Sequence, residues 1–338
     1  MEKLTGRLEP GTRLHERYTI IGLIGAGGMG AVYLADDNRL DGRRCAVKET
    51  QALPGLSDQA AQAMRTQFHR EANILAQLDH PNLPKVSDYF SEGERDYLVM
   101  DYVPGLDLHQ MVAEARRENR FLQEATVMAW AAQLGEALSY LHHQKPPVLH
   151  RDVKPANIKL TLEGRVKLVD FGLVKPLDPD DPKTMTSLHG VGSLPYTPLE
   201  QYVDDLGHTD PRSDLYGLGA TLYHLLTGQK PPSAQTRFLN PATLIPPRRI
   251  NPAISPEMEA AILRALALHP QDRPASVAAW QAMLAGHSLP TSSGGVPALA
   301  APATDWGAVF RENLWLIGVV LVLLALALAM TFGAITAP

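Results

Sequence analysis

Four short stretches of this chain carry the groups that nucleotide phosphate chemistry needs. A glycine-rich run, GAGGMGAV, begins at Gly25, and a glycine backbone can approach phosphates closely because no Cβ intervenes. A strand-like CAVK stretch ends at Lys48, a cation suited to binding phosphate. The stretches HRDVKPAN and DFG then offer Asp152 as a base, with Asn157 and Asp170 as oxygen ligands of the kind that Mg²⁺ prefers. In this order, the stretches predict ATP-dependent phosphoryl transfer.

The elements around these stretches decide what the glycines mean. A dinucleotide-binding loop is followed directly by a helix, whereas the residues here, from Ala31 to Ala35, read as a strand, and Asp41-Gly42 is a hairpin signal. The glycine run therefore joins two antiparallel strands. Further along, Phe68, Glu71, Ala72, Leu75 and Leu78 have helical spacing, after a polar connection over 51–65. An acid on an apolar helix face needs a partner, and Lys48 supplies the opposite charge.

Together the motifs resemble those of the eukaryotic-like (Hanks-type) serine/threonine protein kinases of bacteria, from about Leu14 to Gly286. The resemblance implies an α+β, bilobal protein-kinase-like fold, with a small β-rich N-lobe (14–103) and a larger helical C-lobe (104–286). ATP would bind in the cleft between the lobes, with one or two Mg²⁺ ions.

The resemblance also assigns roles to individual residues. Lys48 would bind the α- and β-phosphates, with Glu71 as its counter-charge. Asp152 would orient the substrate hydroxyl and take its proton, while Lys154 neutralises the transferring group and accompanies serine/threonine specificity. Asn157 and Asp170 would hold the Mg²⁺. The ATP-binding residues would be Ile24, Gly25, Ala26, Gly27, Gly28, Met29, Gly30, Ala31, Val32, Ala46, Lys48, Met100, Asp101 and Val103.

The segment from Asp170 to Glu200 would be the activation segment. Its hydroxyls Thr184, Thr186 and Ser187 are phosphorylation candidates or, equally, polar residues of a loop, and Arg151 would pair with a phosphate there. Ser193 resembles the residue that hydrogen-bonds the base and its lysine. The resemblance gives structural roles to Arg151, Phe171, Gly172, Glu200, Asp214 and Arg273. Here the family's Ala-Pro-Glu is replaced by Pro198-Leu199-Glu200, which affects substrate docking more than phosphotransfer.

Two other functions fit parts of this pattern. A nucleotide-binding pseudokinase that acts as a scaffold typically lacks one of the catalytic residues, and all of them are present here. A small-molecule kinase shares the catalytic aspartate and the Mg²⁺ ligands, but does not usually have the lysine two residues after the base. A protein kinase is the leading hypothesis, with a protein Ser/Thr hydroxyl as acceptor and a transient homodimer for autophosphorylation in trans.

The composition of the chain limits which other partners and bound groups we expect. The net charge of −5 gives no basic footprint and argues against nucleic acid as a partner, and the single cysteine, Cys45, excludes an internal disulfide framework. The histidines lack zinc-ligand spacing. The N-terminal segment (1–13) has no apolar core, so we expect no signal peptide there.

The C-terminal end has a different composition. A linker rich in Pro, Ala, Ser and Gly (287–313) precedes an uncharged apolar run (314–335) that is long enough to cross a bilayer as a helix. Trp306, Arg311 and Trp315 near its start are typical of a membrane interface. We therefore expect a single-pass cell-membrane protein with a cytoplasmic catalytic domain and a tail (336–338) too short for a sensor domain.

Overall fold

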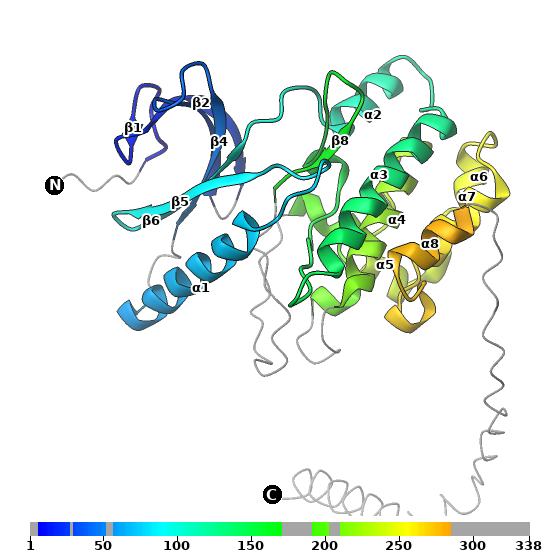
Figure 1. Cartoon of the computed structure of the whole chain (residues 1–338). Helices are drawn as coiled ribbons and strands as arrows, with labels where there is room; N and C mark the ends of the chain where they lie inside the picture. The colour runs from blue at the N-terminus through cyan, green and yellow to red at the C-terminus, as the bar shows by residue number, and fades with distance from the viewer. Residues whose placement is uncertain (1–5, 28–29, 52–56, 171–190, 203–209, 285–338) are drawn as a thin grey trace, which may run out of the picture. The chain divides into compact units, whose positions relative to one another are not determined.

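The computed structural model describes residues 6–27, 30–51, 57–170, 191–202 and 210–284 (Figure 1). All of them belong to the first of two units, Met1–Leu289. Within these ranges no helix combines the length and apolar character that crossing a bilayer requires. The expected linker and membrane helix, 287–313 and 314–335, lie outside the described residues.

The first lobe is built on one antiparallel sheet in the order β1-β2-β3-β4-β6-β5. Alternate residues of β3 face inward, as expected of strands with one buried face, and a core of aromatic and aliphatic side chains forms beneath them. The strands are β1 (Arg13–Leu14), β2 (Tyr18–Gly27), β3 (Gly30–Asp37), β4 (Arg44–Gln51), β5 (Val86–Glu92) and β6 (Arg95–Asp101).

One long helix, α1 (Asp58–Ala76), packs against β5 and β6. The expected polar connection over 51–65 is therefore too long, because α1 begins at Asp58 and Gln51 still belongs to β4. Leu78 is buried as expected, but it lies in the turn after the helix. The polar residues of the first turns of α1 hid its start from a reading based on apolar spacing.

The second lobe is helical, and the bilobal α+β fold is as expected (Figure 1). Two short strands, β7 (Ile158–Leu160) and β8 (Val166–Leu168), pair antiparallel within it. Its α-helices are α2 (Leu108–Arg117), α3 (Glu124–His142), α4 (Pro211–Thr227), α5 (Ala234–Leu239), α6 (Pro247–Ile250), α7 (Pro256–Ala265) and α8 (Val277–Leu284). Its 3₁₀ turns are η1 (Pro155–Asn157), η2 (Val191–Tyr196), η3 (Leu199–Gln201), η4 (Pro241–Thr243) and η5 (Pro270–Asp272).

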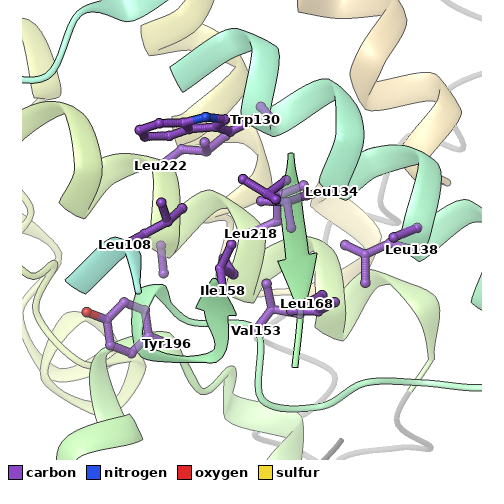
Figure 2. Packing of buried hydrophobic residues seen from close by; sticks show 14 of the residues in the cluster. Leu108, Trp130, Leu134, Leu138, Val153, Ile158, Leu168, Tyr196, Leu218 and Leu222 are labelled. Carbon is purple, nitrogen blue, oxygen red and sulfur yellow. The ribbon is translucent and has the colours of Figure 1, made fainter. Parts of the chain in front are cut away.

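Helix α4 is the centre of this lobe and is buried on all sides from Ser213 to Thr227. Two glycines allow its neighbours to approach closely. A Cβ on Gly217 would lie 2.9 Å from the carbonyl oxygen of Val153, and one on Gly219 would lie 2.7 Å from the Cβ of Ala265. The chain that carries Asp152 therefore rests directly on α4, in the cluster that Figure 2 shows. Gly228 ends α4 with a left-handed C-cap, as expected.

Helix α3 packs beside α4 through an apolar face. The helical spacing of the apolar residues in this stretch predicts a face made of Met128, Ala131, Leu134, Leu138 and Leu141. Four of these are fully buried, but Met128 is exposed, and Val127 takes the inward position.

Candidate active site

The glycine loop is a β-hairpin, as the sequence predicts. Gly27 at the end of β2 pairs with Gly30 at the start of β3, and Gly28 and Met29, between them, lie outside the described residues. Gly30 has φ of +155°, and a Cβ there would overlap the carbonyl oxygen of Glu49 on β4. Only glycine fits this position, and it lets three strands converge where the loop begins.

Apolar residues of both lobes pack in one cluster that includes residues of β3 and β4. Ala46 on β4 and Met100 on β6 are register partners, and both are buried in a cluster that continues into the second lobe. Val32 and Leu160 pack against the same cluster, one from each lobe. Leu160 was not a sequence candidate, because nothing marks a single leucine in a short strand. Apolar side chains of this kind, supplied by both lobes, would suit the faces of a flat aromatic base.

The remaining members of the expected ATP-binding set differ in their exposure to solvent. Ala31 and Val103 are buried, whereas Ile24 and Ala26 on β2 are exposed to solvent. Asp101, at the end of β6, accepts a hydrogen bond from the Lys85 backbone at 3.2 Å.

Lys48 on β4 reaches across to the second lobe, where its Nζ donates to Oδ1 of Asp170. The Lys48 charge lowers the pKa of the Asp170 carboxyl, against the opposing effect of burial. Asp170 has a left-handed backbone (φ 58°), which aspartate tolerates better than most residues. Glu71 on α1 is buried and accepts a hydrogen bond from Gln67 at 2.7 Å. The structure thus brings Lys48 and Asp170 together, and Glu71 is buried on the helix beside the sheet.

Asp152 lies at the centre of a second cluster. Its Oδ2 accepts from Lys154 Nζ at 2.6 Å and from Asn157 Nδ2 at 2.9 Å. Lys154 also donates to the Ser193 hydroxyl at 2.7 Å. The loop over 150–157, which we call the catalytic loop, is therefore linked to η2. Oδ1 of Asp152 has no hydrogen-bond partner among the described residues and is therefore available to a hydroxyl group.

The described residues fit a magnesium site of the kind that uses substrate phosphates. Mg²⁺ usually takes one or two protein oxygens and completes its octahedron with waters and phosphates. The side chain of Asp170 is 40% exposed, and Oδ1 of Asn157 has no hydrogen-bond partner in the described ranges. No cluster of three or more acidic, histidine or cysteine ligands occurs in those same ranges. A metal here would be held by these two residues together with a nucleotide.

Asp214 fixes the backbone of the catalytic loop. It is fully buried, and its two oxygens accept from the backbone N–H groups of His150 (2.9 Å) and Arg151 (2.7 Å). His142 Nε2 lies 2.8 Å from Oδ2. Burial alone would raise the pKa of this carboxyl, but the hydrogen bond and the charge of His142 lower it. His142 was interpreted from the sequence as only a helix end, because its partner lies 72 residues away.

Comparisons with known proteins agree with this geometry. The protein kinase domain model matches residues 18–284. The chain belongs to the protein kinase family. It is 36% identical, over 79% of its length, to a probable serine/threonine-protein kinase of Streptomyces coelicolor, and 37% identical, over 81%, to serine/threonine-protein kinase pkn3 of Myxococcus xanthus. It covers 39% and 50% of those two proteins. The PknI kinase domain of Mycobacterium tuberculosis superposes with a TM-score of 0.63 at 28% identity, covering 84% of this chain and all of that one.

In this kinase the arginine before the catalytic aspartate has an uncommon environment. Arg151 has a left-handed backbone (φ 63°), and its buried Nε has no hydrogen-bond partner within the described ranges. Burial lowers the pKa of the guanidinium, while the charges of Asp214 and Glu71 oppose that effect. Such a group is suited to receive an anion.

Glu200 and Arg273, to which the resemblance gives structural roles, form an ion pair. Both side chains are buried, and two Arg273 nitrogens donate to the two Glu200 oxygens at 2.6 and 3.0 Å. Ser213 donates to the same carboxylate at 2.7 Å. Pro198 directly precedes η3, the turn that carries Glu200. The replacement of Ala-Pro-Glu by Pro-Leu-Glu is therefore compatible with the pair.

Several expected residues of the kinase lie outside the described ranges. They are Gly28, Met29, Phe171, Gly172, Thr184, Thr186 and Ser187. The assignments of these residues stay predictions.

Proposed function

We propose that the chain transfers the γ-phosphoryl group of Mg-ATP to serine or threonine hydroxyls of proteins. The arrangement of Asp152, with Lys154 and Asn157 on one oxygen and no partner on the other, carries this proposal. The names of the bacterial relatives, which are serine/threonine kinases, support it. The relatives are longer than this chain, so the assignment depends chiefly on the site.

The division of work between the two Asp152 oxygens suggests how the acceptor is handled. Oδ1 would accept the hydrogen bond of the substrate hydroxyl, orient it and finally hold its proton. Lys154 and Asn157 keep the carboxylate in place through Oδ2. Lys154 also provides positive charge beside the acceptor, where negative charge is transferred.

The base of the nucleotide would lie against Ala46, Met100 and Leu160, with the β2–β3 hairpin over the phosphates. Lys48 would bind the phosphates, and Asn157 and Asp170 would hold Mg²⁺. The bound metal would supply neutralisation of phosphate charge. The carboxylate of Asp170, which accepts a hydrogen bond from Lys48 in this structure, would bind the metal through one of its oxygens.

Regulation by phosphorylation is part of the proposal. The side chain of Arg151 has no hydrogen-bond partner in the described part of the chain, and a phosphate on Thr184, Thr186 or Ser187 would give it one. Autophosphorylation in trans would require only a transient homodimer. Regulation by phosphorylation is independent of the transfer chemistry. If the regulatory proposal is wrong, the proposed phosphotransfer still stands.

We further propose that the apolar run over 314–335 anchors the kinase in the cell membrane, with the catalytic domain in the cytoplasm. The proposal rests on the length of the uncharged run. Fractionation of cells that express the full chain, with and without residues 314–338, tests it. Recovery of both forms in the soluble fraction would refute membrane anchoring.

Autophosphorylation of the full chain with ATP and Mg²⁺ tests the activity, beside Asp152→Asn. We expect label on serine or threonine that is lost in the variant. Added protein substrates and small alcohols distinguish the alternatives. Label on small alcohols alone would indicate a small-molecule kinase, and ATP binding with no transfer to any acceptor would indicate a pseudokinase.

A further inference from the structure

A pocket of about 650 Å³ lies between α2 and the C-terminal end of α4. We call it the basic pocket, because no acidic residue is found in its described lining and four lining residues are basic. The basic residues are His109, Arg116, His224 and Lys230, and they occur together with Val112 and Ala113.

The positive charge of the basic pocket is not neutralised locally. Arg116 and Lys230 are exposed, and neither forms a salt bridge within the described ranges. Cγ and Cδ of Arg116 lie beside Gly228, so the stem of this side chain runs past the end of α4. Burial lowers the pKa of His224 to about 4, and the charges of His109, Lys230 and Arg116 act in the same direction. Two cations, Arg116 and Lys230, line the same pocket with no acidic residue beside them in the described lining, and such a site favours an anion.

His224 connects the pocket to the substrate side of the kinase. It is buried, and its Nδ1 lies 2.7 Å from the hydroxyl oxygen of Tyr196. The tautomer in which Tyr196 donates to Nδ1 leaves the ring proton on Nε2. Nε2 has no hydrogen-bond partner in the described part of the chain, which gives the pocket a neutral donor beside its cations.

The pocket is also close to the catalytic loop. Tyr196 ends η2, the turn whose Ser193 contacts Lys154, and Tyr196 belongs to the same packed cluster as Leu108 of α2 and Val153 (Figure 2). Helix α2 contacts η1, the turn at the end of the catalytic loop. A peptide that places its hydroxyl at Asp152 therefore has the basic pocket within reach of neighbouring residues.

We propose that the basic pocket binds an acidic or phosphorylated side chain of the protein substrate, close in sequence to the residue that accepts phosphate. The inference rests on the protein kinase activity proposed above. It predicts a kinase that selects acidic segments, with either a carboxylate or a phosphate as the anion that is recognised. Oxyanions of both kinds accept hydrogen bonds from arginine, lysine and imidazole N–H groups.

The test uses the full chain and a peptide set with one serine acceptor, in which each flanking position in turn is Glu, phosphoserine, Ala or Lys. The variant is Lys230→Glu, and the matched control is Arg117→Glu, which makes the same charge change at an exposed residue of α2 that does not line the pocket. The rate of transfer gives kcat/KM. Fluorescence anisotropy of a labelled peptide with alanine in place of serine gives binding without catalysis.

We expect an acidic residue at one or more flanking positions to raise kcat/KM at least about fivefold over lysine, through KM. Lys230→Glu should remove this preference, whereas Arg117→Glu should keep it, and Arg116→Gln should weaken it. Comparison of the Glu and phosphoserine peptides shows which anion is preferred. A normal rate with no acidic preference, or equal effects of Lys230→Glu and Arg117→Glu, would overturn the inference while the kinase activity stands. Acidic peptides that bind in a Lys230-dependent manner but are never phosphorylated would support the pocket and refute the activity.

Discussion

Replacement of Asp214 by asparagine is expected to destabilise the kinase and to stop phosphotransfer, although the two side chains have nearly the same shape. Both carboxylate oxygens accept, from His150 N, Arg151 N and His142. Asparagine keeps one acceptor oxygen and turns an NH₂ group toward a donor. If the asparagine oxygen takes the place of Oδ2, it still accepts from His150 N and His142. The asparagine NH₂ group then faces the N–H group of Arg151, and neither donor has an acceptor.

The magnitude follows from that loss. A hydrogen bond to a charged group contributes about 1.5–3 kcal/mol, and a buried unpaired donor costs about 1–3 kcal/mol. Removal of a buried charge offsets part of this sum, so we expect the free energy of unfolding to fall by about 3 kcal/mol, or roughly 6–12 °C in Tm. Because the Arg151 amide lies next to Asp152, displacement of the loop should lower the rate about a hundredfold or more.

Urea denaturation and autophosphorylation of the two proteins measure both effects. The matched control is Asp210→Asn, at the N-cap of the same helix, where Asp210 accepts from Arg212 N at 2.7 Å. Asparagine caps helices as well as aspartate does, so this change should cost less than about 1 kcal/mol. If Asp214→Asn stays within about 1 kcal/mol of the wild type and keeps its rate, the role given to Asp214 is wrong.

Three further predictions concern other parts of the kinase. Gly30→Ala should lower the free energy of unfolding by at least about 2 kcal/mol and raise KM for ATP, because its backbone (φ +155°) and a β4 carbonyl exclude a Cβ; unchanged urea midpoints and KM would contradict this. The thiol of Cys45, whose pKa burial raises from 9.0 to about 11, should resist alkylation at pH 8 in the folded protein and react fully in urea; equal rates in both would show that it is accessible. Glu200→Gln should cost about 3 kcal/mol by leaving Arg273 buried with half its partner, whereas Glu118→Gln, in an exposed pair, should cost almost nothing; similar midpoints in a urea titration would refute the contrast.

The short motifs allowed much of the fold and the chemistry to be predicted. The strand-like residues from Ala31 to Ala35 and the Asp41-Gly42 turn signal indicated a hairpin rather than a helix after the glycine run, and β2 and β3 form that hairpin. Glycine positions and charged residues in an apolar setting are local signals, so Lys48 and Asp170 could be chosen before their contact was known. Residues whose partners lie far along the chain gave no such signal.

His142 and His224 illustrate that limit. Each lies in a helix with ordinary neighbours in sequence, and each acquires its role from a partner, Asp214 for one and Tyr196 for the other. The basic pocket likewise combines residues near 110 with residues near 230, which only packing of α2 on α4 brings together. The start of α1 was missed for another reason, since its first turns carry little apolar periodicity.

The turn η2 has a consequence for how this kinase can change. Ser193 and Tyr196 lie three residues apart, and one contacts the lysine of the catalytic loop while the other contacts His224. A replacement of this turn intended to retarget the enzyme would also alter its turnover, because one rigid turn serves both contacts. If the basic pocket binds the substrate as proposed, new substrates would be gained more readily by changing Arg116 or Lys230, because no described hydrogen bond ties either side chain to the catalytic loop.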